Sequence, residues 1–402
     1  MNSAKKSISS RQSRANKTMS SSPSFSSADR EYMALAIRCA KRGIYTVTPN
    51  PAVGCVLVRD GKIVGQGWHQ AAGLAHAEVN ALKEAGSEAK GATAYVTLEP
   101  CNHIGRTGAC CEALISAGVS RVVSAMQDPN PQVAGAGHAR LAEAGLVVAS
   151  GLLASEAAAL NLGFIKRMQH QLPYVTCKMA MSLDGRVAMA SGESQWITGS
   201  PARQKVQQLR AASCVIVTGI GTVLKDDPVL NVRHIDSLNS SDHEAILRQP
   251  DLLIIDSSLR TPVTARVLAQ ESLASRRIFV ACAESADTER QKVLKALGVG
   301  VVYLPDESNS KAVSLLSVLR FLAEQEMNHV FVEAGPTLAG QFIDQALIDQ
   351  LKVFVAPKLM GSEAQPLFKL PLAAMSSAIG LTIDDVSAVG DDWLFSCSLS
   401  SS

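Results

Sequence analysis

Aromatic side chains are scarce in this sequence: Phe, Trp and Tyr make up only 4% of its 402 residues, although 47% of the residues are hydrophobic. The cores must therefore be filled mainly by Ala, Val, Leu and Ile, which suits layered α/β domains. The chain is long enough for two such domains. A hydrophobic run of about 18 residues is also missing, so we expect no membrane-spanning segment and no membrane partner.

The sequence also lacks a strong net charge, because 38 basic and 36 acidic side chains give a formal charge of +2. Five of the basic residues and none of the acidic ones lie in residues 1–28, which leaves 33 basic and 36 acidic residues in the remainder. A protein built to hold a nucleic-acid backbone carries a basic surface. The charge balance therefore argues against nucleic acid as a partner.

Cysteine is present, but not in the pattern of a disulfide framework. Such scattered cysteines are typical of buried free thiols in a reducing compartment, so we expect a cytoplasmic protein. Six of the nine cysteines are spread through apolar segments in this way, namely Cys39, Cys55, Cys177, Cys214, Cys282 and Cys397.

Large apolar side chains are nearly absent from residues 1–28, which are basic and rich in Ser. Such a segment buries too little surface to offset the entropy of ordering, so we predict a disordered extension. It has no apolar segment typical of a secretory signal. An organelle transit peptide has a similar composition, and Met19 is a second possible start, so the sequence leaves the role of this extension open.

One histidine, one glutamate and two cysteines form the clearest chemical pattern in the chain. His76 and Glu78 are separated by one residue, and Cys101 precedes Cys110 by nine positions. One imidazole and two thiolates can hold Zn²⁺ and leave its fourth tetrahedral position for water, whose pKa the metal lowers. Glu78, outside this ligand set, can then move the protons of a hydrolytic deamination.

The same spacing predicts local structure. Residues two positions apart lie roughly 200° apart around a helix, so His76 and Glu78 cannot share a face within one. We therefore expect His76 at the entry of a helix, with Glu78 in its first turn. Cys110 is expected to open a second helix, so that both metal-binding segments lie at helix N-termini, where the helix dipole favours a thiolate.

Two weaker interpretations of this pattern remain at this point. An isolated His-x-Glu occurs by chance in many helices. A purely structural zinc would need a fourth protein ligand, for which Cys111 and His103 are the near candidates. The chain would then be a non-catalytic binding protein.

Hydrophobic periodicity predicts a three-layer α/β domain over residues 29–150, the zinc-dependent deaminase domain. Asp29 is expected to cap its first helix, which ends at Gly43. Further helices are expected after His76, after Cys110 and near Ala139. The expected strands are 54–58, 63–68, 93–98, 121–126 and 146–149.

Residues 151–172 are predicted to form a largely helical linker, and a second α/β domain is expected over residues 173–402. Ser200 is expected to cap a helix that has Pro201 at its first position. Residues 234–250 are polar and predict a surface loop. The expected strands of this domain are 174–181, 214–218, 252–256, 277–281, 301–304, 330–333, 351–356 and 393–399.

A Rossmann dinucleotide site is not expected in the second domain. It has no G-x-G-x-x-G that opens a β-α unit and no acidic residue about 20 positions further on. The segment 333–340, Glu-Ala-Gly-Pro-Thr-Leu-Ala-Gly, lies between an expected strand and an expected helix. Its free backbone N–H groups are suited to holding a phosphate, although an ordinary strand–helix turn has the same pattern.

Residues 29 to about 400 resemble the bifunctional riboflavin-biosynthesis family, in which a pyrimidine deaminase is joined to a 5-amino-6-(5-phosphoribosylamino)uracil reductase. Most nucleoside and nucleic-acid deaminases have Cys-x-x-Cys, whereas eight residues separate Cys101 from Cys110, as in this family. The matching stretches are Thr48-Pro49-Asn50-Pro51-Ala52-Val53-Gly54, His76-Ala77-Glu78, residues 99–111 and Met126-Gln127-Asp128-Pro129-Asn130-Pro131.

The resemblance implies an N-terminal cytidine-deaminase-like three-layer α/β/α domain and a C-terminal dihydrofolate-reductase-like α/β domain. It also implies Zn²⁺ and NADPH as cofactors. The metal ligands then fall on His76, Cys101 and Cys110, with Cys111 directed into helix packing. The catalytic acid–base residue falls on Glu78.

Two further residues of the front half are candidates for substrate binding. Asn50 can hold a pyrimidine through paired amide hydrogen bonds, although Asn before Pro is also common in turns. Arg106, with His103 nearby, can grip two phosphate oxygens with its planar fork, or is an ordinary solvated residue. His69 is either a structural histidine or a substrate contact.

In the second half, the resemblance implies two sets of binding residues. Arg210 and Arg233 are candidate phosphate holders, the alternative being ordinary surface charges, and Asp184 is expected to be a turn residue rather than an acid catalyst. The implied NADPH residues are Ala180, Trp196, Thr222, Asp226, Ser257, Gly335, Pro336, Thr337, Leu338, Ala339, Gly340 and Gln341. The implied substrate residues are Ser194, Arg210, Leu230, Arg233 and Glu333.

These features predict a bifunctional enzyme that acts on a small phosphoribosyl-pyrimidine and forms a homo-oligomer. The reactions that the resemblance implies are hydrolytic deamination of 2,5-diamino-6-(5-phosphoribosylamino)pyrimidin-4-one and NADPH-dependent reduction of the ribosyl chain to 5-amino-6-(5-phosphoribitylamino)uracil. The alternative is a nucleic-acid or nucleoside zinc deaminase with an accessory domain. Nucleic-acid binding would need a basic groove lined by aromatic residues, and three Trp and five Tyr argue against it.

Overall fold

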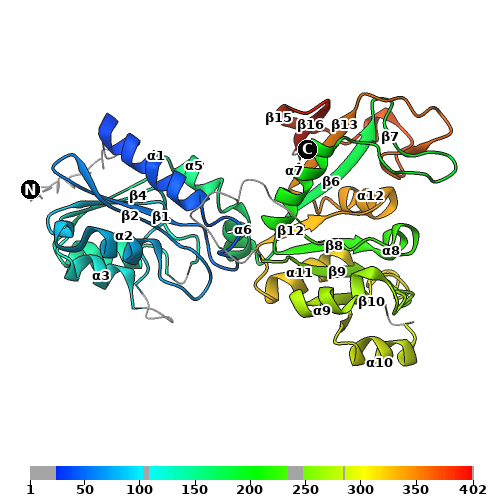
Figure 1. Cartoon of the computed structure of the whole chain (residues 1–402), viewed down its shortest axis with the longest axis horizontal. Helices are drawn as coiled ribbons and strands as arrows, with labels where there is room; N and C mark the ends of the chain where they lie inside the picture. The colour runs from blue at the N-terminus through cyan, green and yellow to red at the C-terminus, as the bar shows by residue number, and fades with distance from the viewer. Residues whose placement is uncertain (1–23, 103–107, 132, 234–247, 284–285, 401–402) are drawn as a thin grey trace, which may run out of the picture.

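The computed structural model describes residues 24–102, 108–131, 133–233, 248–283 and 286–400. Within them the chain forms two α/β bodies, each built on its own sheet, with helix α6 (Leu162–His170) lying between them (Figure 1). The predicted α/β architecture is therefore confirmed. Among the described helices, none has the length and apolar character needed to cross a bilayer.

The first sheet has the strand order β2-β1-β3-β4-β5. β1 pairs antiparallel with β2 and β3, whereas β3, β4 and β5 run parallel. Successive side chains of β1 point to opposite faces, so Cys55 joins the core on one side of the sheet and Val56 the core on the other. The strands are β1 (Gly54–Arg59), β2 (Lys62–Trp68), β3 (Thr93–Val96), β4 (Arg121–Ser124) and β5 (Val147–Ser150).

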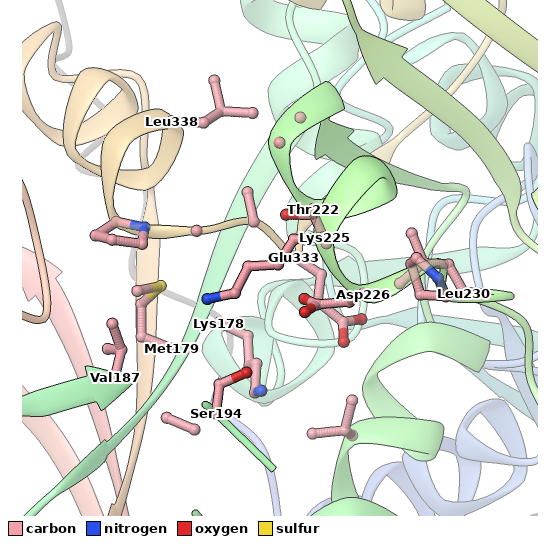
Figure 2. Close-up of a pocket in the computed structure, with 18 of the residues that line it drawn as sticks. Lys178, Met179, Val187, Ser194, Thr222, Lys225, Asp226, Leu230, Glu333 and Leu338 are labelled. Carbon is pink, nitrogen blue, oxygen red and sulfur yellow. The ribbon is translucent and has the colours of Figure 1, made fainter. Parts of the chain in front are cut away.

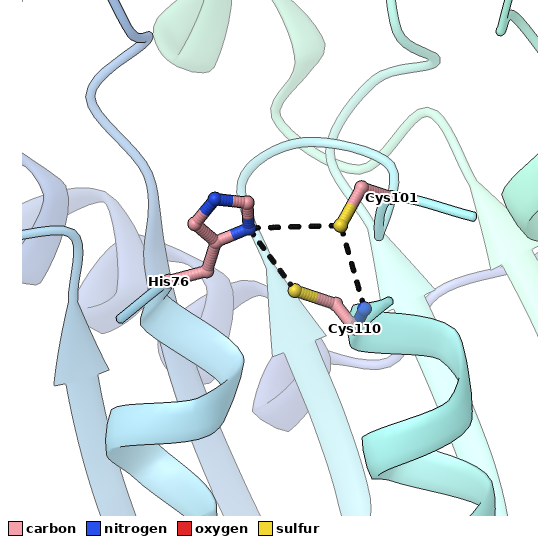
Figure 3. A group of neighbouring side chains, drawn as sticks. All are labelled: His76, Cys101 and Cys110. Carbon is pink, nitrogen blue, oxygen red and sulfur yellow. Dashed lines mark hydrogen bonds between the residues drawn. The ribbon is translucent and has the colours of Figure 1, made fainter. Parts of the chain in front are cut away.

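Helices cover both faces of this sheet and give the three expected layers. Helix α1 (Ser27–Lys41) packs on the face that carries Val56. The opposite face is covered by α2 (Ala77–Ala85), α3 (Cys110–Ser116) and α4 (Ala136–Glu143). This second layer brings the N-termini of α2 and α3 close together at the same end of the strands (Figure 3).

Helix α2 lies unusually close to β2, and Gly67 permits this approach. A Cβ atom at Gly67 would lie 2.3 Å from the backbone oxygen of Ala77 and 2.4 Å from the backbone nitrogen of Ala81. Any larger residue would push the helix away from the sheet. Gly67 therefore fixes the height of the helix whose N-cap residue is His76.

The N-terminus of α1 differs from the prediction. Ser26, and not Asp29, is the N-cap residue, and Asp29 is the third helical residue of a capping box: Ser26 Oγ accepts from the Asp29 amide, and Asp29 Oδ2 accepts from the Ser26 amide. The other oxygen of Asp29 accepts from Tyr95 Oη and from Arg121 Nη1, each at 2.7 Å. Asp29 therefore attaches the helix to the sheet. The N-cap was predicted wrongly because sequence alone does not distinguish the two positions of a capping box.

The second sheet has nine strands in the order β11-β10-β9-β8-β12-β6-β13-β16-β15. The strands from β11 to β13 are parallel, and β16 and β15 close the sheet in antiparallel pairing. They are β6 (Tyr174–Ser182), β8 (Val215–Gly219), β9 (Asp251–Ile255), β10 (Ile278–Cys282), β11 (Gly300–Tyr303), β12 (His329–Val332), β13 (Gln350–Ala356), β15 (Leu381–Val389) and β16 (Asp392–Leu399).

Both faces of the second sheet are buried as well, by separate clusters of apolar side chains. The described helices of this body are α7 (Ser200–Ala211), α8 (Ile220–Asp226), α9 (Gln270–Ser275), α10 (Thr288–Ala296), α11 (Leu315–Glu324) and α12 (Pro336–Asp344), with short 3-10 turns at Arg266–Leu268 and Met375–Ser377. The body is joined to the first one through α5 (Ala154–Ala158) and α6.

Two features of this body depart from the prediction. Gly199, and not Ser200, is the N-cap of α7, so Ser200 and Pro201 begin the helix itself. Three strands were not predicted: β15, and the pair β7 (Arg186–Ala188) and β14 (Gln365–Pro366), which forms a separate small sheet. The polar segment 234–250 lies mostly outside the described residues.

Candidate functional site

Three side chains from different parts of the first body converge on one point (Figure 3). The ligand atoms of His76, Cys101 and Cys110 all lie within 4.8 Å of one another. His76 Nδ1 is 3.2 Å from the sulfur of Cys110 and 3.6 Å from that of Cys101. His76 is the N-cap residue of α2, as its spacing to Glu78 predicted, and Cys110 is the first residue of α3.

These separations fit a zinc ion. Zn–N and Zn–S bonds of about 2.0 and 2.3 Å at the tetrahedral angle place nitrogen and sulfur about 3.5 Å apart. The cluster supplies three ligand atoms of the predicted types at such distances. A fourth corner of the tetrahedron is then left for water.

The surroundings of Cys101 favour its thiolate. The hydrogen bond from the Cys110 thiol holds the pKa of Cys101 well below its usual value. Burial opposes this effect, and His76 and the Cys110 amide add to it. The backbone N–H of Cys110 donates to Cys101 Sγ at 3.4 Å, at the N-terminus of α3. This sulfur is therefore prepared to bind a metal cation.

Glu78 faces the cluster from the first turn of α2. Its side chain is buried, and burial together with the nearby Cys101 raises its pKa to about 7, while a contact with the Cys110 thiol opposes the rise. A carboxyl group with a pKa near neutrality can both accept and release a proton. Glu78 thus has the position and the environment of a general acid–base.

Cys111 and Glu99 support the cluster from behind. The buried sulfur of Cys111 lies 3.2 Å from the carbonyl oxygen of Pro100, so Cys111 points into packing, as predicted. The Glu99 carboxylate accepts four backbone N–H bonds, and therefore fixes the turn that precedes Cys101. The donors are Asp128, Gly135, Gly137 and His138.

Asn50 and His69 lie beside the metal ligands. Asn50 Nδ2 is 2.9 Å from His69 Nε2, and His69 Nδ1 is 3.1 Å from the carbonyl oxygen of Ala75. This pairing requires Nδ1 to donate and Nε2 to accept, and burial lowers the pKa of His69, so its ring is neutral. His69 also packs edge-on against His76, with the ring centroids 5.3 Å apart.

The structure therefore gives His69 a partner on each ring nitrogen, one of which is the side-chain amide of Asn50. Within the described residues, Oδ1 of Asn50 accepts no hydrogen bond, and this oxygen is available to a ligand. Arg106 and His103, the candidate phosphate residues, lie outside the described residues.

A second site lies in the other body, in a cavity of about 830 Å³ (Figure 2). It opens at the carboxyl ends of β8 and β12, where α8 and α12 begin, the usual place for a ligand in an open α/β sheet. The predicted site residues that line it are Ala180, Ser194, Trp196, Arg210, Thr222, Asp226, Leu230, Arg233, Glu333, Gly335, Pro336, Thr337, Leu338 and Gln341.

Three predicted residues do not line the cavity. Ala339 is fully buried in the core beneath α12. A Cβ at Gly340 would lie 2.4 Å from the backbone oxygen of Lys369, so this glycine permits close packing of α12. Ser257 follows β9 outside the lining, and its carbonyl oxygen accepts from the amide of Ala283.

The guanidinium of Arg210 is already occupied. Its Nε and Nη2 each donate to a different oxygen of Glu333 at 2.8 Å, and Nη1 donates to the carbonyl oxygen of Asn231. Burial acts to raise the pKa of Glu333, but Arg210 outweighs it and holds the pKa below its usual value. The ion pair thus presents an anionic Glu333 at the cavity wall.

Lys178 also lines the cavity and was missed by the sequence analysis. It lies on β6 two residues before Ala180, on the same face of the strand. Burial lowers the pKa of Lys178, and Glu333 opposes this effect. The available signal was a lysine within an otherwise apolar strand, which costs too much to bury without a purpose.

Comparisons with known proteins agree with both sites. A family model described as the cytidine and deoxycytidylate deaminase zinc-binding region matches residues 26–126, and the RibD C-terminal domain matches residues 173–395. The riboflavin biosynthesis protein RibD of Escherichia coli K12 is 48% identical over 368 residues, which is 90% of this chain and 97% of that protein. The chain belongs to the RibD family.

Solved RibD structures share the whole architecture. RibD of Acinetobacter baumannii, form 1, has a TM-score of 0.85 at 42% identity. The match covers 93% of this chain and 99% of the Acinetobacter chain. A Thermotoga maritima protein named diaminohydroxyphosphoribosylaminopyrimidine deaminase/5-amino-6-(5-phosphoribosylamino)uracil reductase has a TM-score of 0.79 at 31% identity, with the same coverage. The predicted pairing of a cytidine-deaminase-like domain with a dihydrofolate-reductase-like RibD domain is confirmed.

As a RibD, the chain is a bifunctional deaminase and reductase of riboflavin biosynthesis. Its zinc-binding region contains the His76, Cys101 and Cys110 cluster, so the predicted metal is confirmed. The RibD reductase domain implies a nicotinamide cofactor, for which the 830 Å³ cavity is the available site.

Proposed function

We propose that the first site deaminates 2,5-diamino-6-(5-phosphoribosylamino)pyrimidin-4-one and that the second reduces the ribosyl chain of the product with NADPH, giving 5-amino-6-(5-phosphoribitylamino)uracil. The observation that carries this proposal is the convergence of His76, Cys101 and Cys110 beside a buried Glu78, in a chain that also holds a large reductase cavity. The Thermotoga maritima relative is named for the same pair of reactions.

In the deaminase site, each residue has a role that fits its position. A zinc ion held by the cluster would lower the pKa of a bound water and so supply the nucleophile. Glu78 takes one proton of that water and delivers it to the ring nitrogen, and it then passes the second proton, from the added hydroxyl, to the amino group, which leaves as ammonia. Asn50, oriented by His69, hydrogen-bonds the pyrimidine edge. Arg106 holds the ribose 5-phosphate.

In the reductase site, the protein mainly binds and orients, because the cofactor supplies the hydride. NADPH would be held by Thr222 and Asp226 of α8 and by residues 335–338 at the N-terminal end of α12, all of which line the cavity. The ribosyl chain lies between Ser194, Leu230 and Glu333. Arg233 is exposed and Arg210 is fully paired, so Arg233 is the better phosphate holder.

The proposal also covers the domain organisation, cellular location and assembly of the whole chain. The deaminase unit comprises residues 29–150 and the reductase unit residues 173–402, joined by residues 151–172 and preceded by an extension, residues 1–28. We place the enzyme in the cytoplasm, which agrees with nine free cysteines. It forms a homo-oligomer through the edge strand β15, whose apolar residues Leu381, Ile383 and Val386 are exposed.

Incubation of the full chain with the diaminopyrimidine phosphate, with and without NADPH, tests the proposal. Ammonia release and loss of reduced cofactor are followed separately. We expect ammonia release without NADPH, and cofactor oxidation only once the deaminated product is present. Ammonia release from cytidine or single-stranded RNA, but not from the diaminopyrimidine, would instead favour the nucleoside or nucleic-acid deaminase.

A further inference from the structure

The segment that carries Asn50 is held by residues outside the deaminase sheet. Asn161, at the head of α6, binds both backbone groups of Ala52: its Oδ1 accepts from the Ala52 amide at 2.8 Å and its Nδ2 donates to the Ala52 carbonyl at 2.9 Å. On the other side of Asn50, Thr48 and Pro49 contact the second body. The conformation of the segment 48–52 therefore depends on Asn161 at the start of α6 and on the reductase half.

Asn328 makes the contact from the reductase half. Its Nδ2 donates to the carbonyl oxygen of Pro49 at 2.7 Å, the residue directly before Asn50. Its Oδ1 accepts from Arg167 Nε at 2.6 Å. Arginine is only a donor, so this bond fixes the orientation of the amide and leaves Nδ2 for Pro49.

The surroundings make Asn328 a rigid support. The residue is buried, and it lies directly before β12, which leads to Glu333 at the reductase cavity. Its backbone N–H donates to the sulfur of Cys214 at 3.2 Å, and that sulfur lies 2.8 Å from Thr48 Oγ1. Two neighbouring residues of the segment, Thr48 and Pro49, are thus tied to two neighbouring points of the second body.

We infer that Asn328, although it belongs to the reductase half, is a positioning residue for the deaminase site, acting on the pyrimidine through Pro49 and Asn50. The inference rests on the proposed function, in which Asn50 binds the pyrimidine. Asn50 itself is fixed on its amide side by His69 and on its backbone side by this support. Loosening the support displaces the amide from the substrate without touching the metal ligands.

The variant Asn328→Asp tests this with little change in shape. The aspartate keeps an acceptor for Arg167 and loses only the donor to Pro49, so two acceptors then face each other. We expect kcat/KM for deamination to fall about tenfold, mainly through KM, because Asn50 binds substrate but takes no part in proton transfer. Zinc content and reduction of the already deaminated substrate should not change.

Lys166→Met is the matched control. Lys166 pairs with Asp349 at 2.6 Å across the same interface and does not touch residues 48–52. This variant should keep the wild-type KM for deamination. Thr48→Val removes the hydroxyl near Cys214 from the other side and should raise KM in the same direction, which keeps the test valid if Asn328→Asp folds poorly.

Two results would overturn the inference: a deaminase KM within about twofold of wild type in both Asn328→Asp and Thr48→Val, or a parallel loss of deaminase and reductase activity that Lys166→Met reproduces. Failure of the proposed function itself would give a different experimental result. In that case the wild-type chain would release no ammonia from the diaminopyrimidine, whatever the variants do.

Discussion

Glu78 is buried beside Cys101, and burial together with this sulfur raises its pKa to about 7. The residue contacts the reacting atoms in the proposed mechanism but is outside the metal-ligand set. Metal binding and proton transfer therefore belong to different side chains of one site. They should be separable by substitution.

Glu78→Gln makes that separation. The amide is nearly isosteric but cannot accept and release a proton, so we expect deamination to fall by about 10²–10⁴-fold. Zinc content, measured on the purified variant, should equal that of wild type, and reduction of the deaminated substrate should continue. Deamination at near wild-type rate would show that another group transfers the proton.

The residues of the metal site were predictable because their chemistry is restrictive. Few side chains bind Zn²⁺, and the longer Cys101–Cys110 spacing distinguished the family. The residues that line the cavity were harder to predict. Ala339 and Gly340 were expected to bind NADPH as part of a loop, but both belong to α12, where successive residues point in different directions. Lys178 was missed because a strand position does not reveal which side faces a cavity.

Among the elements, α2 is positioned by a close contact with β2 at Gly67. The helix carries Glu78 in its first turn and His76 at its N-cap. Its height above the sheet therefore sets the distance from His76 to Cys101 and Cys110.

Gly67→Ala should displace α2 and weaken the metal site. The added Cβ would meet backbone atoms that cannot rotate away, and such overpacking costs about 1–3 kcal/mol. We expect lower zinc affinity in a chelator competition and a lower deaminase activity, with unchanged reductase activity. Ser87→Ala, an exposed position just after α2, is the control. Wild-type zinc affinity in Gly67→Ala would contradict this account.

Helix α1 is attached through Asp29. Burial acts to raise the pKa of this carboxylate, but hydrogen bonds from Arg121, Ser26 and Tyr95 outweigh it and hold the pKa well below its usual range. A depressed pKa means that the stabilisation is fully present above the unfolded value of about 3.9 and is lost as the pH falls toward the folded value.

Asp29→Asn should therefore lower the free energy of unfolding by about 2 kcal/mol at pH 7. The difference from wild type should shrink below about pH 4, where the Asp29 carboxylate of the unfolded chain becomes protonated while that of the folded protein stays ionised. Chemical denaturation across this pH range measures the effect. A difference that is constant with pH would mean that shape, and not charge, attaches the helix.

Elements with strong periodicity were predicted well, but the exposed edge strand β15 was not. The first strand of each half lies within about two residues of its predicted bounds, and the helices at His76 and Cys110 begin where they were predicted to begin. Strand β15 was missed because nearly all its residues are exposed, so it lacks the alternation that a half-buried strand shows.

At the scale of the whole molecule, β15 is an uncovered edge of a nine-stranded sheet. It exposes the apolar side chains of Leu381, Ile383 and Val386 beside the charged Asp384 and Asp385. Pairing with a second copy would bury them.

Ile383→Lys should therefore weaken self-association. We expect the mass of the variant in sedimentation equilibrium to lie closer to that of the monomer than the wild-type mass measured at the same concentration. Val147→Lys, at an exposed apolar position of the first body, serves as the control and should keep the wild-type mass. An unchanged mass in Ile383→Lys would place the interface elsewhere.

The two bodies carry out separate reactions, and deamination in the first one requires that three side chains hold a metal ion with one position left for water. X-ray absorption of the zinc-loaded chain measures this directly. We predict two sulfur ligands at about 2.3 Å and two nitrogen or oxygen ligands at about 2.0–2.1 Å. A third sulfur in the zinc shell would contradict the account, because the open position would then be filled by the protein.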